Sequence, residues 1–164
     1  MKCKKVNTHK IGGIFMASVV DVAKYILDKL PDMTAMKLQK LVYYSQAWSL
    51  VWDEEPLFDA PIEAWANGPV VRELYDLHKG QFKVIPSSIN GNPSKLTGLQ
   101  IETIDAVLVF YGDKTGQWLS DLAHMEDPWK IARESEGLAD GEKGSPVIEL
   151  SDMSEYYGGL VQKI

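Results

Sequence analysis

Apolar residues recur at helical spacing in several separate stretches of the chain, and the first stretch begins after Ser18. Ser18 is placed to cap a helix with Asp21 at its third position, and Pro31 ends the run. The apolar positions between them repeat every three or four residues: Val19, Val22, Ala23, Ile26, Leu27 and Leu30. The pattern predicts an amphipathic helix over residues 19–30.

A second, longer helix is predicted after Thr34, which again suits a helix cap. Its apolar residues fall on more than one face: Leu38, Leu41, Val42 and Trp52 on one, Tyr43, Ala47 and Leu50 on others. Such a helix is typically central and largely buried. Its early turns carry Lys37 and Lys40 beside Gln39, so we expect this end to emerge at the surface.

The middle of the chain predicts a third helix and some irregular structure. In Asn67-Gly68-Pro69 the glycine can adopt a positive φ and Pro69 suits a first helical position, so a helix is expected from there to Gly80. Residues 57–65 and 82–85 predict short extended segments. Residues 86–98 are turn formers and predict an exposed loop that separates no domains.

The remaining apolar runs predict a helix over residues 101–111, a short one from Thr115 onward and another over 129–134. Just before the last of these, Asp127 suits a cap and Pro128 the first helical position. Ser151 is expected to cap a final helix. The predicted fold class is therefore mainly α: a compact bundle of about six or seven helices with one or two short extended or β segments.

Length and the local change in composition predict a single domain over residues 16–164. Residues 1–15 differ from the rest because they are basic and carry a short apolar run broken by two glycines. This is a poor match to a signal peptide. We expect a loosely ordered extension or a segment outside the native domain, with Met16 as an alternative start.

Composition narrows the function classes. A net charge of -6 and a pI near 5.1 argue against nucleic-acid binding through phosphate contacts. The same negative charge would favour encounter with a basic partner through long-range attraction. A single cysteine, Cys3, allows no internal disulfide and points to a reducing compartment, so a cytoplasmic location is expected. No apolar run is long enough to cross a membrane.

The sequence contains few arrangements of residues that suit catalysis. The sequence has no nucleophile elbow and no glycine-rich phosphate loop. His124, Glu126 and Asp127 could contribute to a metal site, but His124 could equally bond the last carbonyls of a helix while Asp127 caps the next one. We expect no catalytic residue, no metal and no cofactor.

Aromatic residues are plentiful, with five tryptophans and seven tyrosines. Trp48, Trp118 and Trp129 are expected in the core. Tyr43, Tyr44, Trp65 and Tyr75 fit either a core or a binding surface.

Four blocks in a fixed order add information that no single block carries. They are KLQKLVYY at residues 37–44, PLF at 56–58, AWANGPVVRELY at 64–75 and LAHMEDPW at 122–129. In this order and spacing the chain resembles the Panacea-domain family of SocA-like antitoxins, long labelled as phage-associated proteins. The likeness runs from about Ser18 to the final helix and leaves residues 1–15 outside.

The resemblance implies a bacterial or phage-borne antitoxin that neutralises a protein toxin encoded by the adjacent gene through direct protein–protein binding. The shared domain is paired with many unrelated toxins, so it does not identify this one. One branch of the family instead delivers its toxin to a AAA+ protease, and this adaptor role is the alternative. A metal-dependent enzyme built on His124 and Glu126 is a third hypothesis.

The blocks divide into two sets of residues. Polar or amphipathic positions that stability alone would not require are the partner-binding candidates: Lys37, Gln39, Lys40, Tyr44, Arg72 and His124. Positions that fix helix starts or supply large apolar side chains are expected to maintain the fold: Trp65, Gly68, Pro69, Tyr75, Pro128 and Trp129.

Overall fold

The computed structural model describes residues 17–162, and predictions for residues 1–15 lie outside this range. Residues 17–162 form seven α-helices, four short strands and two 3₁₀ turns. The helices are α1 (Val19–Lys29), α2 (Ala35–Trp52), α3 (Arg72–His78), α4 (Gly98–Tyr111), α5 (Gly116–His124), α6 (Asp127–Glu134) and α7 (Leu150–Gln162). The strands are β1 (Met33–Thr34), β2 (Ile62–Trp65), β3 (Gly68–Val71) and β4 (Lys83–Val84). The predicted mainly α class is confirmed.

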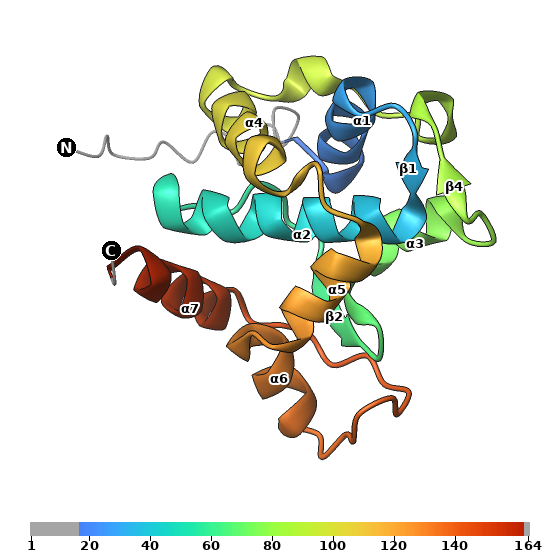
Figure 1. Ribbon diagram of the computed structural model, residues 1–164. Helices are drawn as coiled ribbons and strands as arrows, with labels where there is room; N and C mark the ends of the chain where they lie inside the picture. Colours follow the sequence, from blue (N-terminus) through green and yellow to red (C-terminus); the bar gives the residue numbers. More distant parts are fainter. Residues whose placement is uncertain (1–16, 163–164) are drawn as a thin grey trace.

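Helix α2 lies at the centre of the molecule. It packs against α1 and α4 on one side and against α5 and α7 on the other (Figure 1). Leu38, Leu41 and Tyr44 are fully buried on successive turns. The prediction of a central helix is confirmed, because a helix with apolar residues on several faces must be covered from several sides.

The first helix follows its local signals closely. Ser18 accepts the N–H of Asp21 while the Asp21 carboxylate accepts the N–H of Ser18, which completes the capping box. Thr34 likewise accepts the N–H of Lys37 at the start of α2. Both caps were readable from the sequence.

The predicted helix start at Gly68-Pro69 is wrong. Residues 68–71 form β3, which pairs antiparallel with β2 through a two-residue turn that brings Trp65 opposite Gly68. Gly68 has a φ of +119°, which reverses the chain instead of opening a helix. Val70 and Val71 suit the pleated strand that follows, and α3 begins only at Arg72.

Two predicted caps are also displaced. Helix α6 begins at Asp127, and Glu126 holds the cap position without a side-chain cap bond because its carboxylate turns into the interior. Helix α7 begins at Leu150, one residue before the predicted cap Ser151. The Glu149 carbonyl accepts the N–H groups of Asp152 and Met153, so Ser151 lies inside the first turn.

Two burial predictions need correction. The segment 86–98 is not simply an exposed loop: its two 3₁₀ turns, η2 (Pro86–Ser88) and η3 (Pro93–Lys95), contact α1, and Ile89 and Leu96 are buried in the core. Trp118, predicted in the core, is 45% exposed because the buried face of α5 is formed by its neighbours Leu119 and Ala123.

In residues 17–162, every helix is too short or too polar to span a membrane.

Candidate functional site

The β2–β3 hairpin is held by side chains that reach it from the surrounding helices. Its backbone carbonyls at positions 64 to 67 and 69 each face such a side chain: Arg133, Trp129, His124, Ser120 and Lys40, respectively. The distances include 2.9 Å from Arg133 Nη1 to Ala64 O and 2.8 Å from Trp129 Nε1 to Trp65 O. Buried carbonyls need such donors because they have lost water.

The outer edge of β2 is paired as well. Ala64 donates its N–H to the Pro146 carbonyl, and Ile148 donates to the Ile62 carbonyl, so the segment before α7 runs alongside β2. A two-stranded ribbon is marginal by itself. The helices and this segment therefore fix the hairpin in place.

The side-chain amide of Gln39, on α2, pairs with the backbone N–H and carbonyl of Val71 at the end of β3. Its Oε1 accepts the Val71 N–H at 2.8 Å, and its Nε2 lies 3.3 Å from the Val71 carbonyl and 3.0 Å from His78 Nε2. Gln39 and His78 are both buried. The pair explains why a strand can end against the side of a helix without leaving Val71 unsatisfied.

Lys40, on the next position of α2, reaches beneath the hairpin. Its Nζ donates to the Pro69 carbonyl at 3.2 Å, and burial lowers the pKa of Lys40 to about 7. A Cβ at Gly68 would lie 2.6 Å from Lys40 Cε, so the glycine leaves room for the lysine. The prediction that this end of α2 emerges at the surface is wrong for Gln39 and Lys40, because the hairpin covers both.

His124, Trp129 and Arg133 form a stack against the hairpin. The two ring nitrogens of His124 lie 2.8 Å from the Ser120 and Ala66 carbonyls, and its ring meets that of Trp129 edge to face at 4.1 Å. The Arg133 guanidinium lies over the Trp129 ring, 5.2 Å from its centroid. Both ring nitrogens of His124 thus face backbone carbonyl oxygens.

Arg133 also closes the loop that leads to α7. Beyond Ala64, its guanidinium donates to the Ala139 and Glu142 carbonyls. The residue is 2% exposed and lies outside the blocks identified in the sequence. The signal that could have found it is its place four residues after Trp129, on the same helix face.

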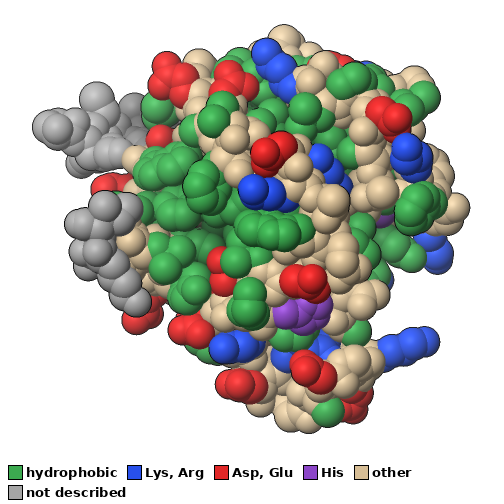
Figure 2. All heavy atoms as spheres, viewed as in Figure 1, with side chains coloured by type: hydrophobic (Ala, Val, Ile, Leu, Met, Phe, Trp, Pro, Cys, Tyr) green, Lys and Arg blue, Asp and Glu red, His purple; other side chains and the backbone are tan. Residues whose placement is uncertain are grey.

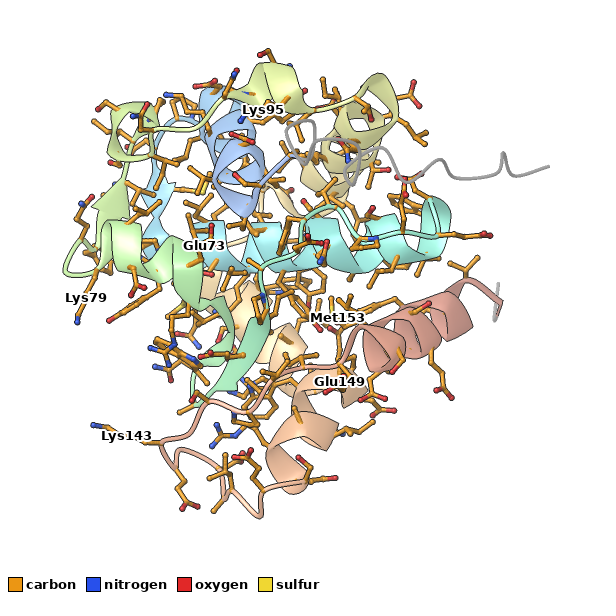
Figure 3. All side chains as sticks on the ribbon, turned by 180° about the vertical axis from the view of Figure 1, so that it is seen from behind. Glu73, Lys79, Lys95, Lys143, Glu149 and Met153 are labelled. Atoms are coloured by element: carbon orange, nitrogen blue, oxygen red, sulfur yellow. The ribbon has the colours of Figure 1, made fainter. Side chains whose placement is uncertain are left out.

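A second buried cluster joins α2, α6 and α7. Tyr44 and Tyr157 both donate to Glu126 Oε1, at 2.8 and 2.6 Å, and the Tyr43 hydroxyl lies 2.9 Å from that of Tyr157. Burial raises the pKa of Glu126, an effect that the two tyrosine donors oppose. Figure 3 shows the neighbouring Met153 between α7 and α2.

The exposed part of the hairpin region combines an arginine with aromatic rings. Arg72 forms an ion pair with Glu63, 3.0 Å between Nη2 and Oε1, and lies 5.0 Å from the ring centroid of Trp65. Tyr75 meets Trp65 edge to face at 4.9 Å. Trp65, Arg72 and Tyr75 border a shallow hollow of about 520 Å³. Lys143 projects beside it from its loop (Figure 3).

The six predicted partner-binding residues therefore separate in space. Arg72 is exposed, Lys37 and His124 are half-buried, and Gln39, Lys40 and Tyr44 are buried. Gln39, Lys40, Arg72 and His124 surround the hairpin, Tyr44 belongs to the Glu126 cluster, and Lys37 donates to the Gly112 carbonyl elsewhere. Among the residues set apart as structural, Gly68, Pro69, Pro128 and Trp129 are buried, and Trp65 and Tyr75 are half-buried.

The metal hypothesis gains no support from the geometry. Within residues 17–162, no three side chains of His, Cys, Asp or Glu gather in a way that could hold a metal ion. Glu126 instead accepts two tyrosine hydroxyls.

A family model described as "Antitoxin SocA-like, Panacea domain" matches residues 38–130. The chain belongs to this family. The matched range covers more than half of the chain and includes most of α2, the whole hairpin and the start of α6. The resemblance inferred from the four blocks is thereby confirmed, and the Panacea match supports an antitoxin role with a protein partner. Searches of curated proteins and of solved structures found no match.

Proposed function

We propose that this chain is the antitoxin of a toxin–antitoxin system and that it neutralises a protein toxin, encoded by the adjacent gene, through direct protein–protein binding. The observation that carries the proposal is the Panacea-domain match over residues 38–130. The proposal places the chain in the cytoplasm, with no enzymatic step, cofactor or nucleic-acid contact in its action.

The internal contacts of the signature residues favour a binding protein over an enzyme. An active site needs polar groups that can reach a substrate, with a base or nucleophile free to act. Here the Gln39 side chain accepts the Val71 N–H, and Lys40 donates to the Pro69 carbonyl. Both ring nitrogens of His124 face backbone carbonyls. These side chains act through the fold.

Arg72 is the candidate best placed to touch a partner directly. It is exposed, and it is already ordered by Glu63 and Trp65, which lowers the entropy cost of engaging a partner. Lys37 and His124 offer smaller exposed areas. Gln39, Lys40 and Tyr44 would affect a partner only by shaping the hairpin and α2.

The test is growth of a host that expresses the adjacent gene alone and together with this chain, followed by co-purification. Rescue with a stoichiometric complex supports direct neutralisation. Rescue in which the toxin disappears, and which requires a AAA+ protease, would instead establish the adaptor role. An adjacent gene that is harmless by itself would contradict the antitoxin proposal.

A further inference from the structure

An apolar groove lies between the ends of α2, α4 and α7, away from the hairpin. Its volume is about 690 Å³, and its wall includes Trp48 and Trp52 of α2, Val109 and Phe110 of α4, and Val161 of α7. Figure 2 shows hydrophobic side chains gathered over this part of the surface. None of these residues belongs to the four sequence blocks.

The groove exposes more apolar surface than the fold requires. Val109 is 85% exposed and Phe110 68% exposed, on adjacent positions of one helix, and Trp52 and Val161 are each 43% exposed. Single exposed apolar residues are ordinary, but a contiguous group marks a contact surface.

Ring contacts and a hydrogen bond hold the floor of the groove in place. The Trp48 ring stacks on Trp52 with centroids 5.0 Å apart, and Trp48 Nε1 donates to the Tyr111 hydroxyl at 3.0 Å. Tyr111 stacks in turn on the buried Tyr44. Large aromatic side chains already held in place are favourable binding anchors, because little rotamer freedom is lost on docking.

Exposed acidic residues lie close to the groove residues along the chain. Glu102 lies four residues before the groove residue Ala106 on α4, Asp113 lies in the turn after α4, and Glu54 follows Trp52 by two residues; all three are exposed. Lys114 forms an ion pair with Asp113, 3.7 Å between Nζ and Oδ1, and its Nζ also lies 5.0 Å from the Trp118 ring centroid.

The described part of the chain is also acidic as a whole. All 23 acidic residues lie within residues 17–162, whereas five of the 17 basic residues lie outside that range. The described part is therefore more acidic than the net charge of -6 for the whole chain. An acidic surface attracts a basic partner and raises its association rate.

From these observations we propose that the groove is the toxin-docking surface and that it takes an amphipathic helix of the toxin, with an apolar face flanked by Lys or Arg residues. A helix laid in a groove between helices presents apolar side chains every three or four residues, which suits aromatic anchors such as Trp48 and Phe110. This inference rests on the proposed antitoxin function and adds the surface and the chemistry of the partner.

The first test uses substitutions that place a carboxylate in the groove. Val109→Glu and Phe110→Asp should each weaken binding of the purified toxin by about 100-fold or more, because a charge would be desolvated against the toxin's apolar face. The matched control is Phe82→Asp, since Phe82 is another exposed phenylalanine, 77% exposed, outside the groove. The control should bind as wild type, and all three variants should keep the wild-type unfolding temperature.

Failure of the groove and failure of the antitoxin function give different results. If the wild type rescues growth and binds the toxin, but Val109→Glu and Phe110→Asp bind as tightly as Phe82→Asp, the groove proposal is overturned and the antitoxin function stands. If the wild type neither rescues nor binds, both are overturned.

A photo-crosslinking amino acid at position 109 of the full chain identifies what occupies the groove. The proposal predicts a crosslink to a toxin peptide with apolar residues at helical spacing and with Lys or Arg beside them. A crosslink between two copies of this chain, or one to residues 1–16 of the same chain that persists in the complex, would overturn it.

Discussion

The β2–β3 hairpin and the α2–α4–α7 groove are built on opposite principles. The hairpin is rich in signature residues, and the side chains of Lys40, His124 and Trp129 meet backbone carbonyls that would otherwise be buried without a partner. The groove contains no signature residue, yet it leaves the apolar side chains of Val109 and Phe110 largely exposed. A recognisable motif therefore marks where the fold is most demanding, whereas a binding surface can lie where the sequence has no motif at all.

The largest expected effect on the hairpin side comes from Gly68→Ala. The new Cβ would lie 2.6 Å from Lys40 Cε, at a φ of +119° that L residues rarely adopt, so we expect a loss of about 3 kcal/mol in the free energy of unfolding. Urea unfolding measures it. The control is Gly80→Ala, also at positive φ but with open space around it, which should lose about 1 kcal/mol. Equal losses in the two variants would show that Lys40 does not constrain the hairpin.

Gln39→Leu should come next, with a loss of roughly 2 to 3 kcal/mol in unfolding free energy. The change leaves the buried Val71 N–H and carbonyl without their partners. Gln117→Leu is the comparison, because Gln117 is exposed and bonds only the neighbouring Asp121; its loss should stay below about 0.5 kcal/mol. If Gln39→Leu is as stable as Gln117→Leu, the bonds between Gln39 and Val71 do not stabilise the fold.

Lys40→Met tests the buried ammonium through pH. The pKa of Lys40 is lowered to about 7 in the folded state, so between pH 7 and the usual lysine range the unfolded chain binds one more proton. The wild type should therefore gain about 2 kcal/mol of stability from pH 7 to pH 9 relative to Lys40→Met. Chemical unfolding at several pH values checks this, and parallel profiles for the two proteins would contradict it.

The smallest expected effect belongs to Arg72→Ala. Its ion pair with Glu63 is exposed on the Arg72 side and screened by solvent, so the free energy of unfolding should hardly change. If the groove carries most of the toxin contact, Arg72→Ala should weaken binding by less than about tenfold. Titration of the purified toxin against this variant and Val109→Glu ranks the two surfaces. A larger loss for Arg72→Ala would reverse the comparison.

Local sequence signals predicted much of the fold, for reasons that are themselves local. The caps at Ser18 and Thr34 and the many-sided apolar pattern of α2 act within a few residues, and each was confirmed. Gly68-Pro69 was misread because a positive-φ glycine can open a helix or reverse a hairpin, and the choice depends on Gln39 and Lys40, some thirty residues earlier.

The candidate site was less predictable than the fold. Lysine and glutamine side chains are usually exposed, so Lys40 and Gln39 were expected at the surface. Both are buried because the hairpin packs over this end of α2. The groove was missed for a related reason: Trp48 and Phe110 are far apart in sequence, and neither position is unusual until α2 and α4 lie together.

Hydrogen–deuterium exchange of the chain, alone and in complex with its toxin, tests the central claim most directly. The account predicts that toxin binding slows amide exchange in residues 104–112 at the end of α4 and in the last turn of α7, while residues 64–71 of the hairpin exchange as in the free chain. Slowing confined to the hairpin and to residues 72–75, with α4 unchanged, would contradict it.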